Sequence, residues 1–242
     1  MNVIVLFSGS SAAFKDAGYS FPKNLAEVGG QPLVQTVLDH LGGLRALDAR
    51  FICLLRCEEN RTFHTGAVIQ LAQPSTTIVE LASETSGAAC SALLAVQHID
   101  NDSPLVIVNG DQLLLDVDLA AAVLEFRKRK LDGGIIVFED LHPRWSFVKC
   151  DEQGFVIETA EKRPISKLAT AGFYYFARGA DFVAGATSMI KKDAQVNGLF
   201  YICPVYNEMI LQQKKIGVHQ VPKEAYRTLS TPTDVNSYNS QR

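Results

Sequence analysis

The tripeptide Asn109-Gly110-Asp111 is the segment of this sequence with the clearest chemical potential. It follows an apolar run, residues 104–108, that is typical of a buried parallel strand. A carboxylate at the carboxyl end of such a strand points into the crevice where open α/β sheets bind ligands. Asp111 is therefore a candidate ligand for a hard cation such as Mg²⁺, which prefers oxygen donors and substrate phosphates. The alternative is a plain turn, because Asn, Gly and Asp are common turn residues.

A second candidate is the loop that follows the first predicted strand, residues 8–24. Small residues after a strand let backbone N–H groups approach phosphates closely. Lysines in the same loop could supply positive charge to a polyphosphate. The candidate phosphate-binding residues are Gly9, Ser10, Ser11, Lys15 and Lys23. The alternative is a flexible polar loop with two surface lysines, since short Gly/Ser motifs often match by chance.

Glu84, Ser86 and Gly87 precede a predicted helix of small residues. A glycine at this helix start leaves room for a flat ring or a ribose to lie on the backbone. The polar groups of Glu84 and Ser86 could contact the edge of a base. The alternative is simple capping of the helix by Ser86.

Glu161 and Lys162 follow a strand-like run and place an acceptor beside a cation. Such a pair suits a sugar hydroxyl and a phosphate. The alternative is an exposed turn with a weak ion pair. The five histidines show no metal-binding spacing, and no Ser/His/Asp or Cys/His nucleophile set is recognisable.

Alternating strand and helix patterns must position these residues. Strands are predicted at 3–7, 51–55, 76–81 and 105–108, and helices at 32–41, 61–71, 87–99 and 116–130. We expect Cys90, Leu93 and Leu94 to be buried in the third of these helices. This order predicts a parallel sheet covered on both faces.

After Gly133-Gly134 the pattern changes to short strands at 135–138, 147–150, 155–159 and 171–176. Helices are predicted at 181–190 and 204–211, and Thr231 with Pro232 and Asp234 has the pattern of a helix start. We interpret this part as a mixed extension of the same sheet. The expected organisation is one domain with two halves, 1–132 and 133–242.

Composition narrows the class of protein. The chain has 242 residues, is 47% hydrophobic and carries a formal charge of -3, so no basic surface for nucleic acid is expected. No segment has the ~20 apolar residues that a membrane span needs. The five scattered cysteines favour a reducing compartment. These features predict a cytoplasmic protein and leave homo-oligomer formation open.

The order of the motifs resembles that of the sugar-1-phosphate nucleotidyltransferase family over essentially the whole chain. The matching segments are Gly9-x-x-x-x-Phe14, Ala17-Gly18-Tyr19, Pro22-Lys23, Val28-x-Gly30-x-Pro32, Gly87, Asn109-Gly110-Asp111, Glu161-Lys162, Gly172-x-Tyr174 and Ser230-Thr-Pro-x-Asp234. The stretch from Trp145 through Glu161-Lys162 to residues 204–208 is most similar to a bacterial surface-polysaccharide subgroup.

The resemblance implies a three-layer α/β/α Rossmann-like fold with a mixed central sheet. It implies a reaction in which an NTP and a sugar 1-phosphate give an NDP-sugar and pyrophosphate. Lys23 would hold the triphosphate, Asp111 would bind Mg²⁺ and Gly87 would form the floor of the base pocket. Further nucleotide contacts would come from Gly9, Ser10, Ser11, Lys15, Glu84, Ser86 and Asn109. The sugar phosphate would be held by Glu161, Lys162, Gly172 and Asn207.

Two departures from the family pattern fall on charged groups. The family's loop usually carries an Arg where this chain has Ala13, and its second metal-binding Asp is replaced by Thr228. Losing one such group can cost ~10²–10³ in rate. Lys15 is the candidate that could compensate for the missing Arg.

Three hypotheses follow. The first is a nucleotidyltransferase that activates a sugar 1-phosphate, or a similar small phosphorylated compound, for surface polysaccharide assembly. The second is a catalytically impaired sugar-nucleotide-binding protein with a regulatory role, which the two departures favour. The third is a glycosyltransferase that uses Asp116-x-Asp118, although carboxylates at a helix start are commonly caps.

Overall fold

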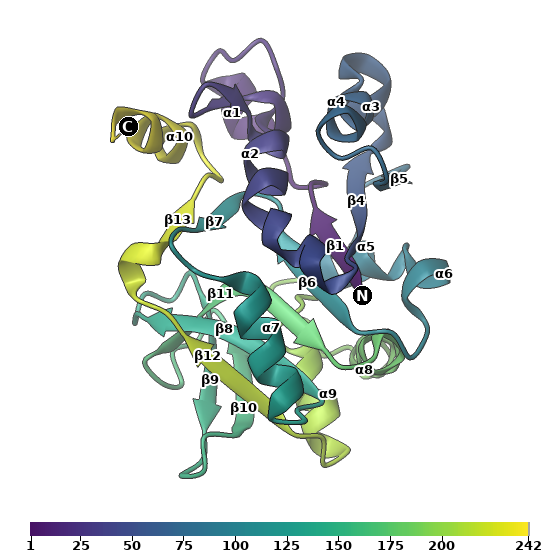
Figure 1. Cartoon of the computed structure of the whole chain (residues 1–242), viewed down its shortest axis with the longest axis vertical. Coiled ribbons are helices and arrows are strands. Elements are labelled where there is room, and N and C mark those ends of the chain that lie inside the picture. The colour runs from purple at the N-terminus through teal and green to yellow at the C-terminus, as the bar shows by residue number, and fades with distance from the viewer. Residues whose placement is uncertain (242) are drawn as a thin grey trace.

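A mixed sheet forms the centre of the structure, a computed structural model that describes residues 1–241. Within that range nine strands join in one sheet, and helices cover both of its faces (Figure 1). This confirms the predicted three-layer α/β/α fold. The strands are β1 (Asn2–Leu6), β2 (Glu27–Val28), β3 (Gln31–Pro32), β4 (Arg50–Arg56), β5 (Thr77–Leu81), β6 (Leu105–Asn109), β7 (Gln112–Leu114), β8 (Gly133–Glu139), β9 (Ser146–Cys150), β10 (Val156–Glu161), β11 (Leu168–Phe176), β12 (Ile216–Gln220) and β13 (Tyr226–Thr228).

The helices connect these strands in the order expected for such a fold. They are α1 (Ala12–Asp16), α2 (Leu33–His40), α3 (Cys57–Phe63), α4 (Thr65–Ala72), α5 (Ala88–Leu93), α6 (Val96–Ile99), α7 (Leu119–Lys128), α8 (Gly179–Lys191), α9 (Val205–Leu211) and α10 (Pro232–Ser240). Three short 3₁₀ helices in the described chain are η1 (Lys23–Leu25), η2 (Leu41–Leu47) and η3 (Lys223–Ala225). None of the helices within residues 1–241 is both long and apolar enough to span a lipid bilayer.

The first half of the sheet is parallel. β1 lies between β4 and β6, with Val3 opposite Phe51 on one side and Val106 on the other. Val3 belongs to the core on one face of the sheet and Ile4 to the core on the other. These strands are continuous apolar runs because both of their faces are buried.

The second half extends the same sheet with mostly antiparallel strands. β11 pairs with β6, β8 and β9, all antiparallel, and β12 adds to β8 in parallel. The short strands β2, β3, β7, β12 and β13 have no sequence prediction. In β12 the segment Ile216–Gln220 contains Gly217 and two polar residues, so its strand conformation depends on the partner β8.

Two of the predicted helices are wrong as continuous elements. The helix expected over 61–71 is broken at His64, whose φ of 53° places it in the left-handed region between α3 and α4. The helix expected over 87–99 is split into α5 and α6. Leu94, expected to be buried, is 51% exposed at this break, and Cys90 and Leu93 are only half-buried.

Local side-chain caps set the starts of α7 and α10. α7 begins at Leu119 rather than at the predicted 116, because the Asp118 carboxylate accepts a hydrogen bond from Ala121 N at 2.9 Å. This capping role leaves no support for Asp118 in a glycosyltransferase metal motif. At α10, Thr231 and Asp234 form the predicted capping box.

α10 also fixes the chain near the first loop. It lies beside α1 and the β2–β3 region in Figure 1. Asn239 accepts a hydrogen bond from Gly29 N at 2.8 Å and donates one to Glu27 O at 3.0 Å. The helix start at Thr231 therefore matters for the loop that carries Lys23 as well as for α10 itself.

Thr231→Ala tests the cap. We expect a loss of about 1 kcal/mol in the free energy of unfolding, because Asp234 N loses its side-chain partner. Thermal and urea unfolding measure this loss. The matched control is Ser240→Ala, whose hydroxyl bonds Asn236 O within the same helix and contributes little to helix stability. Equal stability of Thr231→Ala and the wild type would contradict the capping role.

Candidate active site

Four segments converge at the edge of the sheet where the parallel strands end. Residues 8–11 follow β1, Arg56 ends β4, residues 82–87 follow β5, and Asp111 follows β6. Strands β1, β4, β5 and β6 are neighbours and run in the same direction. Their carboxyl ends consequently gather the predicted nucleotide-side residues at one edge, as parallel α/β sheets do.

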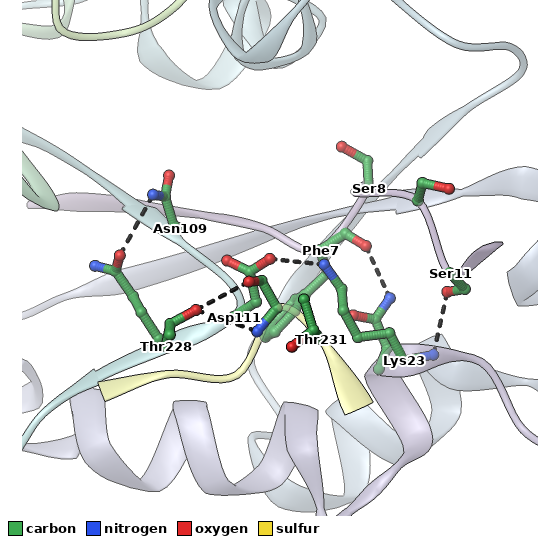
Figure 2. Close-up of polar contacts among 12 residues, drawn as sticks. Phe7, Ser8, Ser11, Lys23, Asn109, Asp111, Thr228 and Thr231 are labelled. Atoms are coloured by element: carbon green, nitrogen blue, oxygen red, sulfur yellow. Dashed lines mark hydrogen bonds and ion pairs between the residues drawn. The ribbon is translucent and has the colours of Figure 1, made fainter. Parts of the chain in front are cut away.

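Lys23 and Asp111 form an ion pair at this edge (Figure 2). Lys23 Nζ lies 2.7 Å from Asp111 Oδ2, and the two side chains are 6% and 27% exposed. A Cβ on Gly9 would lie 2.9 Å from Lys23 Nζ, so the glycine leaves space for the lysine. Ser11 Oγ accepts a hydrogen bond from Lys23 N at 3.1 Å and ties the loop to the same residue.

A buried polar network around Asn24 fixes the backbone next to Lys23. Asn24 Nδ2 donates to Phe7 O and to Glu59 Oε1, both at 2.8 Å. Thr65 Oγ1 donates to the same Glu59 oxygen at 3.1 Å, and burial raises the pKa of the Glu59 carboxyl. The network fixes η1 against the end of β1, so the direction of Lys23 is set by its neighbour. Sequence analysis missed Asn24 and Glu59, since nothing in their spacing marks them.

The backbone around Asp111 is fixed on two sides. Gly110 N donates to Leu6 O at 3.1 Å, and Leu229 N donates to Asp111 O at 2.8 Å. A Cβ on Gly110 would lie 2.5 Å from the Phe7 ring, so only glycine fits between β1 and β6. Asp111 is thus presented by a rigid turn and not by a mobile loop.

Three of the five phosphate-loop candidates line a cavity of about 520 Å³, whereas Gly9 and Lys23 do not. Ser10, Ser11 and Lys15 lie on one side of it, and Arg56 and Glu59 lie on the other. Ala13 is an exposed residue of α1 and is not among the lining residues. Lys15 and Arg56 are therefore the two cations that the structure brings to this cavity.

Arg56 links the predicted base-contact segment to the phosphate loop. The Arg56 guanidinium donates from Nε to Ser8 O at 2.9 Å and forms an ion pair through Nη1 with Glu84 Oε1 at 2.9 Å. Gly87 has a φ of 111°, and a Cβ there would lie 2.4 Å from Phe200 O. We expected glycine here to leave room for a base. The structure gives a different reason, which is the close approach of the Phe200 backbone.

A second cavity, of about 240 Å³, joins the two halves of the chain. Predicted residues from both halves line it: Asn109, Asp111, Glu161 and Gly172. Residues without a sequence prediction that also line it are Gln112, Arg144, Tyr201 and Tyr226. Thr228, which stands where the family resemblance implies a second metal-binding Asp, lines it as well.

Glu161 is buried in the wall of this cavity, where Ser146 Oγ donates to its carboxylate. Burial raises the pKa of Glu161, against the opposing effects of that hydrogen bond and the Lys162 charge. Lys162 does not itself line the cavity and lies at its rim, where its Nζ is 2.9 Å from the hydroxyl of Tyr201, which does line it. The predicted pair is therefore split, because the carboxylate faces inward and the ammonium is held by Tyr201.

Gly172 and Asn109 meet at the floor of the cavity. Gly172 has a φ of 63°, and a Cβ there would collide with the Gln112 and Asn109 side chains. Asn109 Nδ2 donates to Gln112 Oε1 at 3.3 Å, as Figure 2 shows. Both residues shape the floor next to Asp111.

Asn207, a predicted contact of the sugar phosphate, does not line the cavity. Its amide accepts from Thr159 N at 2.8 Å and donates to Thr159 O at 2.9 Å. These bonds tie α9 to β10. A contact between Asn207 and a substrate would require them to open.

The donor set suits a cation that shares its coordination with substrate phosphates. Asp111 supplies one carboxylate, and Thr228 supplies a hydroxyl in the same cavity. Within residues 1–241, no group of three or more His, Cys, Asp or Glu side chains gathers to hold a metal alone. Mg²⁺ is commonly bound by one or two carboxylates plus substrate phosphates, so these residues fit it.

The Asp234 carboxylate is the other acid near Thr228. It accepts from Thr231 Oγ1 at 2.8 Å and from Ser230 Oγ at 3.2 Å. Asp234 Oδ2 therefore accepts hydrogen bonds that stabilise the start of α10.

Comparisons with solved structures agree with this arrangement. A nucleoside-diphosphate-sugar pyrophosphorylase from Vibrio cholerae RC9 is 27% identical, with a TM-score of 0.86 and 100% of each chain covered. A candidate glucose-1-phosphate thymidylyltransferase from Bacillus anthracis is 19% identical, with a TM-score of 0.74 over 100% of this chain and 94% of that one, and supports the fold alone.

No curated protein matches the sequence. Residues 3–169 match the MobA-like NTP transferase domain, which is more than half of the chain. The strand-end Asp111, the small-residue loop and the mixed sheet are the features expected of such a domain. This chain belongs to the MobA-like NTP transferase domain family.

Proposed function

We propose that the protein transfers a nucleotidyl group from an NTP to a sugar 1-phosphate or a similar phosphorylated small molecule. An oxygen of the acceptor phosphate attacks the α-phosphorus, and the bond from that phosphorus to the oxygen bridging to the β-phosphate breaks. An NDP-sugar forms and pyrophosphate leaves with the bridging oxygen. The attacking phosphate is already an anion, so the step needs no general base.

One observation carries this proposal: the Lys23–Asp111 ion pair lies beside a cavity whose far wall holds Glu161. The cation and the strand-end carboxylate suit a triphosphate and its counterion. The buried Glu161 suits a sugar hydroxyl, and Lys162 at the rim suits the acceptor phosphate. A site of this kind works by alignment of the reacting groups and neutralisation of charge.

We assign the residues separate tasks. The Ser10–Ser11 backbone and Lys15 bind the outer phosphates, and Lys23 neutralises charge that develops on the departing pyrophosphate. Asp111 holds Mg²⁺, which when bound would neutralise phosphate charge and help align the phosphates. Glu84, Ser86 and Gly87 contact the base, and Asn109 and Gly172 complete the floor.

The biological setting is part of the same proposal. The motif order from Trp145 through Glu161-Lys162 to residues 204–208 resembles a bacterial surface-polysaccharide subgroup, which supports a role in surface polysaccharide biosynthesis. The site draws on nucleoside triphosphates, and we accordingly assign the reaction to the cytoplasm.

A second candidate is a catalytically impaired sugar-nucleotide-binding protein with a regulatory role. Ala13 and Thr228 lack the charges that the family usually has at these positions, and Thr228 is hydrogen-bonded to Ser230 at 2.9 Å. Pyrophosphate release from each NTP across a panel of sugar 1-phosphates with Mg²⁺ separates the candidates. Turnover of one pair supports the transferase, whereas nucleotide binding without release supports the binding protein.

Asp111→Asn is expected to lower pyrophosphate release by at least about 10²-fold, since an amide is a poor ligand for Mg²⁺ and leaves Lys23 without its counter-charge. Circular dichroism and thermal unfolding check that the fold is retained. The control is Asp118→Asn, a cap of α7 away from the cavity, which should keep the wild-type rate. Unchanged turnover in Asp111→Asn removes this residue from the metal site.

Lys162→Ala is expected to raise the KM for the phosphorylated acceptor about tenfold or more and to leave the KM for NTP nearly unchanged. The reason is the position of Lys162 on the sugar side of the cavity rim. Lys167→Ala is the matched control, because Lys167 is an exposed lysine of the same stretch. Equal losses for both substrates would contradict this division of tasks.

Lys15→Ala is expected to slow turnover by about 10²-fold, because Lys15 is one of the two cations that line the phosphate-side cavity. Adding Ala13→Arg to that variant should restore part of the rate, because the long side chain returns a cation to the same short helix α1. Lys128→Ala, on the far helix α7, serves as the control. A Lys15→Ala enzyme with the wild-type rate shows that the loop charge is not used.

A further inference from the structure

Tyr201 occupies a position between the two halves of the site. Its hydroxyl lies 2.9 Å from Lys162 Nζ, and that nitrogen lies 5.1 Å from the centre of the Tyr201 ring. Tyr201 also lines the cavity that contains Asp111 and Glu161. Sequence analysis gave this tyrosine no role, because nothing in the spacing links it to Lys162.

The backbone beside Tyr201 is held firmly by the nucleotide side. Phe200 N donates to Ser86 O at 2.7 Å, and Phe200 O accepts from Ala89 N at 3.0 Å. Gly87 lies between these bonds and must be glycine for Phe200 to approach. The backbone bonds of Phe200 therefore fix Tyr201 next to the start of α5.

Lys162 needs such a partner. Its backbone is fixed by a φ of 54° and by the bond from Lys162 N to Trp145 O at 2.9 Å, but its side chain is exposed. A free lysine side chain loses rotamer entropy when it binds an anion. A fixed hydroxyl at the ammonium removes part of that cost before the anion arrives.

The groups around the Lys162 ammonium also favour its charged form. The Tyr201 hydrogen bond is the main cause that raises the pKa of Lys162, and the Glu161 carboxylate adds to it. Lys162 is thus kept as a cation at the rim. The Tyr201 hydroxyl accepts one hydrogen bond from the Lys162 ammonium. The other two N–H groups of the ammonium remain for an anion.

We infer that Tyr201 is a positioning residue that holds Lys162 to receive the phosphate group of the acceptor. The inference rests on the proposed function for the identity of the acceptor, but not for the binding of a phosphate group at Lys162. Inorganic phosphate is therefore the probe for the site.

Tyr201→Phe keeps the ring and removes only the hydroxyl. In the full-length protein, calorimetry should show about three- to tenfold weaker binding of inorganic phosphate, the effect of one lost hydrogen bond. NMR of the Lys162 Nζ group should show that it titrates at a lower pH in the variant. Tyr175→Phe is the matched control, since its hydroxyl faces Arg127 and does not line the cavity.

A double-mutant comparison separates positioning from general damage. If Tyr201 acts through Lys162, then Tyr201→Phe should cost no further phosphate affinity in a Lys162→Ala background. The inference is overturned if Tyr201→Phe leaves both phosphate affinity and the Lys162 titration unchanged, if the two losses add fully, or if the wild type binds no phosphate.

The outcomes distinguish this inference from the proposed function. Tyr201-dependent phosphate binding with no pyrophosphate release from any substrate pair supports the inference and removes the transferase proposal. Turnover with the same acceptor KM in wild type and Tyr201→Phe supports the transferase and overturns the positioning role.

Discussion

The ion pair between Lys23 and Asp111 is the interaction on which the arrangement of the site depends. The pair is only partly buried, with side chains 6% and 27% exposed, and pairs of this kind add little net stability compared with apolar side chains of similar size. The pair is thus better explained by function than by stability. Gly9 leaves the space that Lys23 needs, Gly110 lets the turn before Asp111 pack against Phe7, and Asn24 fixes the backbone next to Lys23.

The two kinds of sheet give the site its two sides. The parallel strands β1, β4, β5 and β6 end together and present the phosphate loop, Arg56 and Asp111. The antiparallel extension β9–β11 brings Glu161 to the same cavity from the other half of the chain. Membership of the MobA-like NTP transferase family agrees with this division, and the proposed transfer uses both sides.

Sequence reasoning predicted what short-range patterns encode. Apolar runs located the parallel strands and so placed Asp111 at a strand end, and Thr231 marked a real helix start. Such patterns do not predict contacts between residues that are far apart in the sequence. The Lys23–Asp111 pair spans 88 positions, and the Tyr201–Lys162 pair spans 39. The break at His64 requires a left-handed residue that no glycine marks, and β12 forms only because β8 offers an edge.

The most direct measurement of the central claim follows two labels through one reaction. The protein is incubated with Mg²⁺, a sugar 1-phosphate and an NTP that carries ³²P on either the α- or the γ-phosphate. Nucleotidyl transfer predicts that the α-label appears in the NDP-sugar and the γ-label in pyrophosphate, in equal amounts. Bound nucleotide with neither label transferred across the substrate panel, or γ-label found on the sugar, would contradict the account.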